Sequence, residues 1–241
     1  MPIPLAGLGN SNYGVKENIK ILKERIEEIR AKRGIKEEIK IVAAAKGVPV
    51  AKIREAIDCG IKIIGENRVQ EALAKYEILG DACEWHMIGH LQTNKVKKAC
   101  TIFRMIQSVD SLRLAQEINR RAEEKKRIME ILIEVNTSKE ERKFGLPPSS
   151  LFPFIEAVLP LRYIKPVGLM TLGPELSVLD KEKSRPCFAQ LRELREEIKR
   201  RYNLPDFSIL SMGMSSDYEV AIEEGSNMIR IGRAIFGERS E

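Results

Sequence analysis

Short hydrophobic runs alternate with longer amphipathic segments from residue 39 to the end of the chain. Most of the runs are hydrophobic at nearly every position, which is typical of parallel strands covered on both faces. The runs lie at residues 39–46, 61–67, 84–91, 103–109, 129–136, 164–172, 207–214 and 227–237. The pattern therefore predicts eight buried parallel strands.

The segments between these runs have helical periodicity. The predicted buried positions are Ile53, Ala56 and Ile57 in residues 50–60, and Leu112, Ala115, Ile118 and Ala122 in residues 111–126. We expect Gly60 to cap the end of the first of these helices and Ser111 to cap the start of the second. Residues 12–34 predict a further helix before the first strand.

Alternating strands and helices predict the α/β class. Eight strand–helix units within 241 residues favour a (β/α)8 TIM barrel with an extra N-terminal helix. A doubly wound open sheet is the structural alternative. No linker interrupts the pattern, so we expect residues 1–241 to form one domain.

Composition narrows the class of protein. Hydrophobic residues make up 43% of the chain and charged residues 32%, which predicts a sizeable core and excludes extensive disorder. The net charge of +6 arises from 41 basic and 35 acidic residues that are largely interleaved. Because a nucleic-acid footprint needs clustered basic residues, we expect no nucleic-acid partner.

The cysteines and the N-terminus predict the compartment. Four scattered cysteines form no C-x-x-C pair, which favours a reduced protein over a disulfide scaffold. The N-terminal stretch lacks a basic region ahead of an apolar one, and no apolar run approaches the length of about 18 residues that a membrane span needs. We therefore predict a cytoplasmic protein without a membrane partner.

Polar residues collect where the predicted strands end. They include Lys46, Asn67, His90, Asn136, Met170 with Thr171, Ser215, and Arg230 with Gly232. In parallel α/β proteins the ligand lies at the carboxyl ends of the strands, where the following loops gather. The sequence therefore predicts one functional site at this end of the barrel.

Lys46 is the first candidate residue of that site. It ends the run IKIVAAAK, in which small alanines give it an apolar, close-packed setting. Such burial disfavours the ammonium form and can supply the neutral amine that forms a Schiff base. A lysine that extends from the strand end into solvent is the structural alternative.

Residues 211–237 predict a phosphate site. Loops after strands seven and eight commonly bind phosphate in this barrel, because backbone N–H groups and hydroxyls converge there. Ser215 and Ser216 can donate hydroxyls, and Gly232, beside Arg233, allows close approach of the backbone. An ordinary turn of small residues is the alternative. The joint occurrence of the two serines, Arg230 with Gly232, and Lys46 favours a phosphate site.

The histidines do not predict a metal site. His86 and His90 form H-M-I-G-H, which lacks the glutamate of H-E-x-x-H and lies in a predicted strand. A site formed by Cys83 and both histidines would lack the fourth ligand of a structural zinc. We therefore expect no bound metal.

Several blocks of this sequence resemble the pyridoxal phosphate homeostasis proteins, single-domain relatives of the N-terminal barrel of alanine racemase. The blocks are AAAKG, IGENRVQEA, WHMIGHLQTNK, VGLMTLGP and SMGMSSDYEVAIEEGSNMIRIGRAIFG, in the order found in that family. The resemblance extends from the first predicted helix to the C-terminus. It implies a barrel that binds pyridoxal 5'-phosphate (PLP).

The resemblance also implies roles for single residues. Lys46 resembles the lysine that forms the Schiff base with PLP, and Arg230 resembles the arginine that faces the pyridine nitrogen. Ser215, Gly232 and the backbone at Arg233 resemble the phosphate cradle, while Asn67, His90 and Met170 match blocks that line the pocket. Arg233 departs from the family, since many members have a small hydroxyl residue there.

The predicted function is reversible binding of PLP for its buffering and delivery, without efficient catalysis. Racemases of this type need a second acid/base and a C-terminal domain, and no such domain follows residue 241 in this sequence. The expected partners are PLP and the PLP-dependent apoenzymes that receive it, and we expect a monomer. A weak racemase with Tyr218 or His90 as second base, and a cofactor-free Schiff-base aldolase, are the alternatives.

Overall fold

Eight parallel strands close into a barrel in chain order in the computed structural model, which describes residues 13–238. The strands are β1 (Lys40–Ala44), β2 (Ile63–Glu66), β3 (Glu84–Met87), β4 (Met105–Val109), β5 (Met129–Glu134), β6 (Ile164–Met170), β7 (Ile209–Ser211) and β8 (Met228–Ile231). Because β1 pairs with both β2 and β8, the sheet has no free edge, and an open sheet is excluded. The predicted TIM barrel is confirmed.

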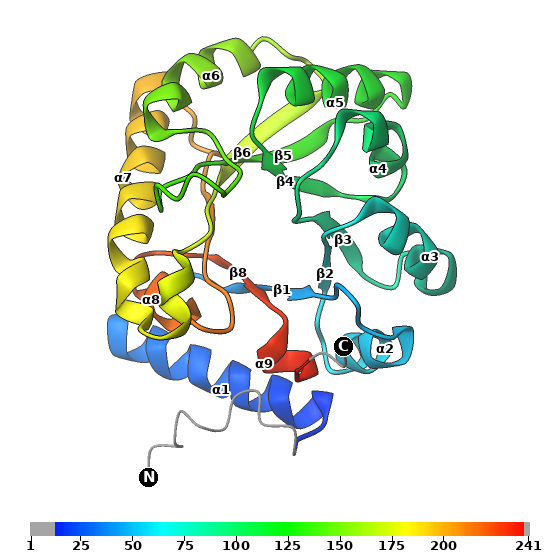
Figure 1. The fold of residues 1–241 in the computed structure, drawn as a ribbon, viewed down its shortest axis with the longest axis vertical. Helices are drawn as coiled ribbons and strands as arrows, with labels where there is room; N and C mark the ends of the chain where they lie inside the picture. Colours follow the sequence, from blue (N-terminus) through cyan, green and yellow to red (C-terminus); the bar gives the residue numbers. More distant parts are fainter. Residues whose placement is uncertain (1–12, 239–241) are drawn as a thin grey trace.

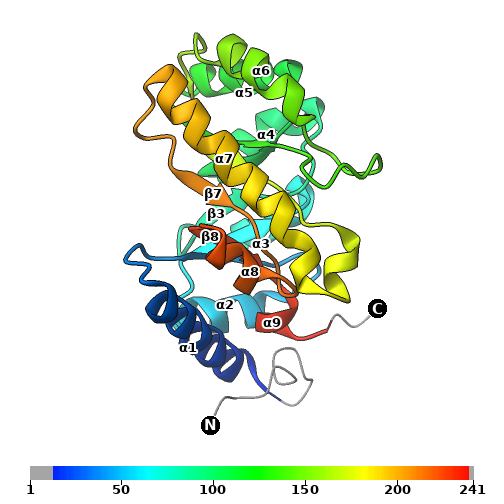
Figure 2. The same cartoon turned by 90° about the vertical axis from the view of Figure 1, so that its left-hand side faces the viewer.

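Helices surround the barrel and connect successive strands (Figures 1 and 2). They are α1 (Val15–Arg33), α2 (Val50–Asp58), α3 (Val69–Leu79), α4 (Val96–Ile102), α5 (Leu112–Glu124), α6 (Leu151–Val158), α7 (Arg185–Tyr202), α8 (Tyr218–Glu223) and α9 (Arg233–Phe236), with short 3-10 turns at Thr93–Lys95, Pro148–Ser150, Glu175–Val178 and Lys181–Ser184. None of the helices in residues 13–238 is long and apolar enough to cross a membrane.

The extra helix before the first strand is α1, which packs along α2, α8 and α9 (Figure 1). It ends at Gly34, whose φ of +67° gives the left-handed conformation that favours glycine at a helix end. Residue 12, where the predicted helix begins, lies outside the described residues. The N-terminal stretch behind the prediction of no secretory signal lies mostly outside them as well.

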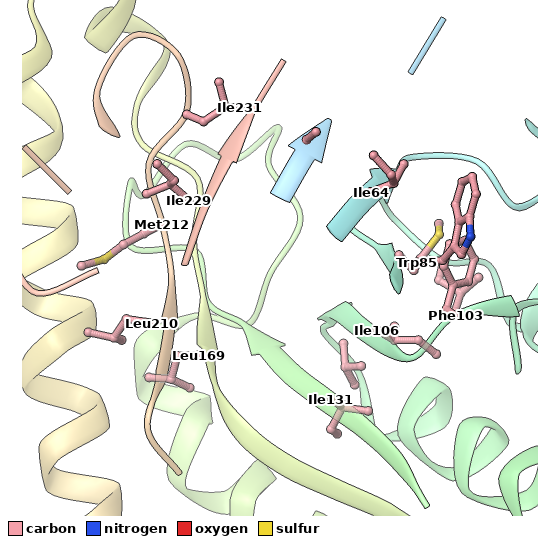
Figure 3. Close-up of a cluster of buried hydrophobic side chains, with 14 of the residues drawn as sticks. Ile64, Trp85, Phe103, Ile106, Ile131, Leu169, Leu210, Met212, Ile229 and Ile231 are labelled. Atoms are coloured by element: carbon pink, nitrogen blue, oxygen red, sulfur yellow. The ribbon is translucent and has the colours of Figure 1, made fainter. Parts of the chain in front are cut away.

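The hydrophobic core has two layers, one on each face of the barrel wall. Outward side chains pack under the helices, and Figure 3 shows Trp85, Phe103 and Ile106 among them. Inward side chains fill the barrel, and they include Val42, Ile63, Met105, Leu132, Val167, Met170 and Met228. Because both faces are buried, neighbouring residues such as Ile63 and Ile64 are both apolar, which explains the nearly continuous hydrophobic runs.

Two details of the sequence prediction are wrong. The run at 227–237 is not one strand, because β8 ends at Ile231 and the chain turns into α9. In α5, Leu114 is buried, whereas Leu112 is 36% exposed. Leu112 is the first residue of the helix, immediately after the Ser111 cap, and lies outside the buried stripe.

Candidate functional site

The predicted site residues all lie on the side of the carboxyl ends of the strands, which we call the barrel mouth. They belong to the loops after β1, β2, β3, β7 and β8 or to the last residues of β6 and β8. Lys46, Asn67 and His90 line one cavity of about 380 Å³. Gly232 and Arg233 line a second cavity of about 320 Å³ on the other side of the β1–α2 loop.

Lys46 lies at the first of these cavities and is half-buried. The alanines before it, Ala43 and Ala45, are fully buried, so the apolar approach to Lys46 is as predicted. Lys46 itself is only partly buried, since its side chain lines an open cavity together with Asn67 and Gln92. The amine is therefore accessible from the mouth.

Three charged side chains behind this loop, Glu66, Glu71 and Lys75, form what we call the Lys75 cluster. The Lys75 ammonium donates to Glu66 Oε1 at 2.6 Å and to Glu71 Oε1 at 2.7 Å. It also donates to the backbone carbonyl of Ala45 at 2.6 Å. Glu66 is fully buried and Lys75 is 7% exposed, so this is an ion cluster inside the protein.

The Lys75 cluster holds the chain on both sides of Lys46. The Gly47 amide donates to Glu71 Oε1 at 2.5 Å, while the Ala45 carbonyl accepts from Lys75. Sequence reasoning missed this arrangement. The available signal was the spacing of Glu71 and Lys75 four residues apart in the IGENRVQEA segment and its continuation.

The two carboxylates of the cluster differ in their titration. Burial raises the pKa of Glu66 to about 7, against the effect of Lys75, and its Oε2 has no hydrogen-bond partner among the described residues. Burial also acts to raise the Glu71 pKa, but hydrogen bonds from Lys75 and the Gly47 amide outweigh it and hold that pKa below its ordinary value. Burial thus raises the pKa of Glu66, whereas hydrogen bonds lower that of Glu71.

Arg230 points into the barrel from β8 and is buried. Its Nη1 donates to Ser211 Oγ at 2.7 Å, and its Nη2 donates to the Thr171 carbonyl at 2.7 Å. Burial lowers the pKa of Arg230 to about 10, although the nearby carboxylates Glu134 and Asp217 oppose this shift. The guanidinium is therefore still charged at neutral pH.

Glu134, at the end of β5, is a titratable residue inside the barrel that the sequence prediction missed. Its side chain is 4% exposed, and no hydrogen bond to its carboxylate is found in residues 13–238. Burial raises its pKa to about 7, with a further increase from Asp110 and an opposing effect of Arg230. Met170, its register partner on β6, is buried in the inner core layer.

The turn between β7 and α8 lies next to the start of α9. The Ala234 amide donates to Ser215 Oγ at 3.2 Å, which joins the two segments, and both Ser215 and Ser216 are half-buried. A Cβ on Gly232 would lie 3.3 Å from the Ala44 carbonyl oxygen, so this position leaves little room for a side chain. Arg233 is exposed, which agrees with a backbone contribution from this residue.

His90 is exposed at the mouth and interacts with two other loops. Its ring stacks on Phe144 with centroids 3.9 Å apart, and its Nδ1 lies 3.5 Å from Asp110 Oδ2. Tyr218, the other expected acid/base candidate, lies elsewhere. It is buried, and the charges that act on its phenol are those of Glu219 and of Arg25 and Glu28 on α1. Its side chain lies in the hydrophobic core and is not among the residues that line the cavity of Lys46.

Metal ligands do not cluster in the part of the chain that the structure describes. No group of three or more His, Cys, Asp or Glu side chains there could hold a metal ion. Cys83 lines a different cavity, of about 780 Å³, at the amino ends of β2 and β3, whereas His90 lies at the mouth. Cys83 and His90 are thus on opposite sides of the barrel.

Comparisons with known proteins identify close relatives of the whole chain. The alanine racemase N-terminal domain family matches residues 15–240. A pyridoxal phosphate homeostasis protein of Aquifex aeolicus is 47% identical over 225 residues, which cover 92% of this chain and 97% of that protein. One from Homo sapiens is 36% identical over 250 residues, covering 97% of this chain and 90% of the human protein.

Solved structures agree with these relatives. PipY of Synechococcus elongatus PCC7942, solved with PLP bound, is 34% identical with a TM-score of 0.81, over 92% of this chain and all of that chain (100%). Alanine racemase of Clostridium difficile 630 has a TM-score of 0.74 at 16% identity and shares the fold. This chain covers 61% of that racemase.

Proposed function

This chain belongs to the alanine racemase N-terminal domain family and, within it, to the pyridoxal phosphate homeostasis proteins, and we propose that it binds PLP reversibly and keeps it in reserve for other proteins. The observation that carries this proposal is the accessible amine of Lys46 on a braced loop at the barrel mouth. PipY, which is similar along the whole chain, has been solved with PLP bound.

The residues at the mouth fit the chemical groups of PLP. An aldehyde needs a primary amine, which Lys46 offers, and a pyridine nitrogen needs a donor, which Arg230 offers. A phosphate needs hydroxyls and close backbone, and these are available at Ser215, Ser216 and Gly232, where a Cβ would approach Ala44. The cavities beside Lys46, of about 380 and 320 Å³, are in the size range of small-molecule sites, about 300–1,000 Å³.

We assign the covalent attachment to Lys46, as a Schiff base. When bound, PLP supplies an aldehyde that amines add to reversibly and a ring that can withdraw electrons. Lys46 is half-buried and lines an open cavity, through which a second amine could approach the group that Lys46 would hold. Asn67 and His90 line this cavity, and Met170 lies in the inner core layer beneath the mouth.

Arg230 favours a carrier over a catalyst. With a pKa of about 10, its guanidinium stays protonated at neutral pH and is a poor acid. It would therefore donate a hydrogen bond to the ring nitrogen without transferring a proton, which leaves the ring a weak acceptor of electrons. Reactions that need a stabilised carbanion are thereby disfavoured.

Of the two candidates for the second base of the racemase alternative, Tyr218 fits less well. It is buried in the core and does not line the cavity of Lys46, and burial raises the pKa of its phenol above the ordinary value. His90 remains at the mouth, stacked on Phe144. Exchange of substrate α-deuterium at a catalytically useful rate, lost on His90→Ala, would establish the racemase; no exchange across a panel of amino acids supports the carrier.

The decisive experiment is reduction of the PLP-loaded protein with borohydride, followed by mass spectrometry of its peptides. We expect the pyridoxyl group on Lys46, and an absorption band of bound PLP that is lost in Lys46→Ala. Lys165→Ala is the matched control, since Lys165 lies at the amino end of β6, away from the mouth, and should leave both results unchanged. A colourless protein that traps a sugar phosphate on Lys46 would instead establish the aldolase.

The wider role follows from reversible attachment. Amine-bearing apoenzymes that need PLP are the recipients we propose, and transfer from loaded protein to such an apoenzyme in the presence of a PLP-trapping competitor tests direct delivery. We also propose that the chain acts as a monomeric, cytoplasmic, single-domain protein. Sedimentation of the purified chain with and without PLP tests the monomer.

A further inference from the structure

A chain of four polar side chains crosses the hydrophobic interior of the barrel and ends at Arg230. From the mouth inward, Arg230 Nη1 lies 2.7 Å from Ser211 Oγ, and Ser211 Oγ lies 2.6 Å from Gln107 Oε1. Gln107 Nε2 lies 2.9 Å from His86 Nδ1. All four residues are at most 4% exposed, and they come from β8, β7, β4 and β3.

The donors and acceptors of this chain can be assigned from Arg230. A guanidinium only donates, so Ser211 Oγ accepts from it and must place its own proton on another acceptor. Gln107 Oε1 is that acceptor, which leaves the amide N–H₂ of Gln107 directed at His86 and at Met228 Sδ, 3.2 Å away. His86 Nδ1 therefore accepts, and the proton of a neutral His86 is on Nε2.

The surroundings of His86 agree with a neutral ring. Burial lowers its pKa below the ordinary value, against the effect of Glu84 and Glu130 and together with that of Lys40. Its Nε2 has no hydrogen-bond partner among the described residues, and Glu84 Oε2 lies 3.7 Å away. A hydrogen on Nε2 thus points toward a carboxylate, while Nδ1 remains free to accept.

We propose that Ser211, Gln107 and His86 are positioning residues for Arg230, and that they hold its guanidinium at the mouth only while His86 is neutral with its proton on Nε2. The proposal rests on the proposed function for the role of Arg230 toward PLP. A second proton on His86 would make Nδ1 a donor and force the Gln107 amide to turn. Ser211 would then face two donors and lose the acceptor for its own proton.

The hydrogen bonds among these four side chains can be tested without PLP. The protein contains only two histidines, so ¹⁵N-histidine labelling gives two sets of ring signals, with exposed His90 as the internal reference. We expect His86 to show the neutral Nε2–H form at neutral pH, and Gln107→Leu to shift its Nδ1 signal. An Nδ1–H form of His86, or a doubly protonated ring at neutral pH, would overturn the proposal.

The effect on Arg230 is then read from PLP binding. Ser211→Ala and Gln107→Leu should each weaken PLP binding about 10-fold, the value of one lost buried hydrogen bond, and shift the absorption maximum of bound PLP. Ser108→Ala is the matched control. Ser108 is the next residue in β4, buried, and donates to the Gly89 carbonyl at 2.6 Å outside the chain, so its loss should leave that maximum unchanged.

A conservative variant provides the rescue. In Gln107→Glu the carboxylate can accept from Ser211 and from a protonated His86, so the chain is restored with both His86 nitrogens protonated. We expect near-native PLP binding and a raised His86 pKa in this variant. Equal spectral changes in Ser108→Ala and Gln107→Leu contradict the proposal. If the native protein does not bind PLP at all, the proposed function fails. The histidine signals then still decide which donors and acceptors the four hydrogen-bonded side chains use.

Discussion

Lys46 and Arg230, two residues of the candidate site, are held in place in opposite ways. Lys46 is on a loop that is braced from outside the barrel by the charges of the Lys75 cluster. Arg230 is on a strand and is held from inside by the hydroxyl of Ser211 and the carbonyl of Thr171. The anchor of Lys46 is made of charged side chains, and the anchor of Arg230 is made of its hydrogen bonds to an uncharged hydroxyl and a carbonyl.

This difference suits the two tasks. The amine of Lys46 must be reachable by other amines, and its loop is half-exposed while the groups that hold it are buried behind it. The guanidinium of Arg230 does not need to move, and it is enclosed by the barrel wall. Removal of a charge should therefore damage the Lys46 anchor most, whereas a change of protonation inside the barrel should act on Arg230.

The largest effect is expected from Lys75→Met. The substitution removes the cation that pairs with Glu66 and Glu71 and the donor to the Ala45 carbonyl. Because Glu66 then stays buried without a partner and Glu71 keeps only the Gly47 amide, we expect a loss of about 3–5 kcal/mol in the free energy of unfolding at pH 8. Urea unfolding followed by circular dichroism measures this loss.

Lys165→Met is the control for that prediction. Lys165 also pairs with a carboxylate, Asp206, at 2.9 Å, but the two side chains are 48% and 74% exposed. A solvent-exposed pair contributes at most about 1 kcal/mol, so this variant should unfold at nearly the native urea concentration. Similar losses in both variants would mean that the cluster behaves as a surface ion pair.

An intermediate effect is expected from Glu134→Gln. The pKa of Glu134 is about 7 in the folded protein, chiefly through burial, against an ordinary value of 4.5. The folded state therefore binds this proton more tightly, so the stabilisation is complete below pH 4.5 and is lost as the pH rises through about 7. Since glutamine cannot ionise, the variant should gain about 2–3 kcal/mol relative to the native chain between pH 5 and pH 8.

Glu66→Gln, measured in the same experiment, compares a buried carboxylate that is paired with Lys75 with the carboxylate of Glu134. The pKa of Glu66 is also raised to about 7 by burial, but Glu66 accepts a hydrogen bond from Lys75 at 2.6 Å. The ionised form of Glu66 thus pairs with Lys75, whereas no hydrogen bond to the carboxylate of Glu134 is found in residues 13–238. We expect Glu66→Gln to gain less free energy of unfolding at pH 8 than Glu134→Gln does. Urea unfolding at pH 5 and pH 8 measures both gains. A larger gain in stability for Glu66→Gln would mean that the ion pair of Glu66 with Lys75 does not stabilise the Lys75 cluster.

The fold could be predicted because the sequence pattern carries its physical cause. Strands buried on both faces need apolar residues at nearly every position, and eight such runs with helices between them leave few arrangements. The ends of elements were less certain. In β8 the hydrophobic pattern continues into α9, and only the turn at Gly232 separates them.

The site could be predicted only where the chain order determines it. Residues that follow strands must meet at one end of a parallel barrel, which locates Lys46 and Arg230. The Lys75 cluster was missed, because a glutamate and a lysine four residues apart look like an ordinary surface pair. Its burial depends on how α3 packs on the loop after β1, which involves residues 30 apart in sequence.

The smallest and most selective effect is expected from Gly47→Ala, compared with Gly34→Ala. Both glycines have a left-handed backbone, with φ of +70° and +67°, and a Cβ at either position would meet no heavy atom within 4 Å. Each substitution should therefore cost only the backbone strain, about 1–2 kcal/mol. The two variants are matched in stability and differ in place, since only Gly47 is bonded to Glu71.

Trace acetylation of the PLP-free protein, with mass spectrometry of each lysine peptide, then reports on the Lys46 loop alone. In Gly47→Ala, relief of the strain displaces the amide that donates to Glu71, so the rate of Lys46 acetylation should change by about 5-fold, as expected for about 1 kcal/mol. In Gly34→Ala the rate should remain native, because Gly34 precedes the amino end of β1, whereas Lys46 follows its carboxyl end. Equal acetylation rates of Lys46 in the two variants would show that the loop does not depend on the Lys75 cluster. The proposed difference between the anchors of Lys46 and Arg230 would then be wrong.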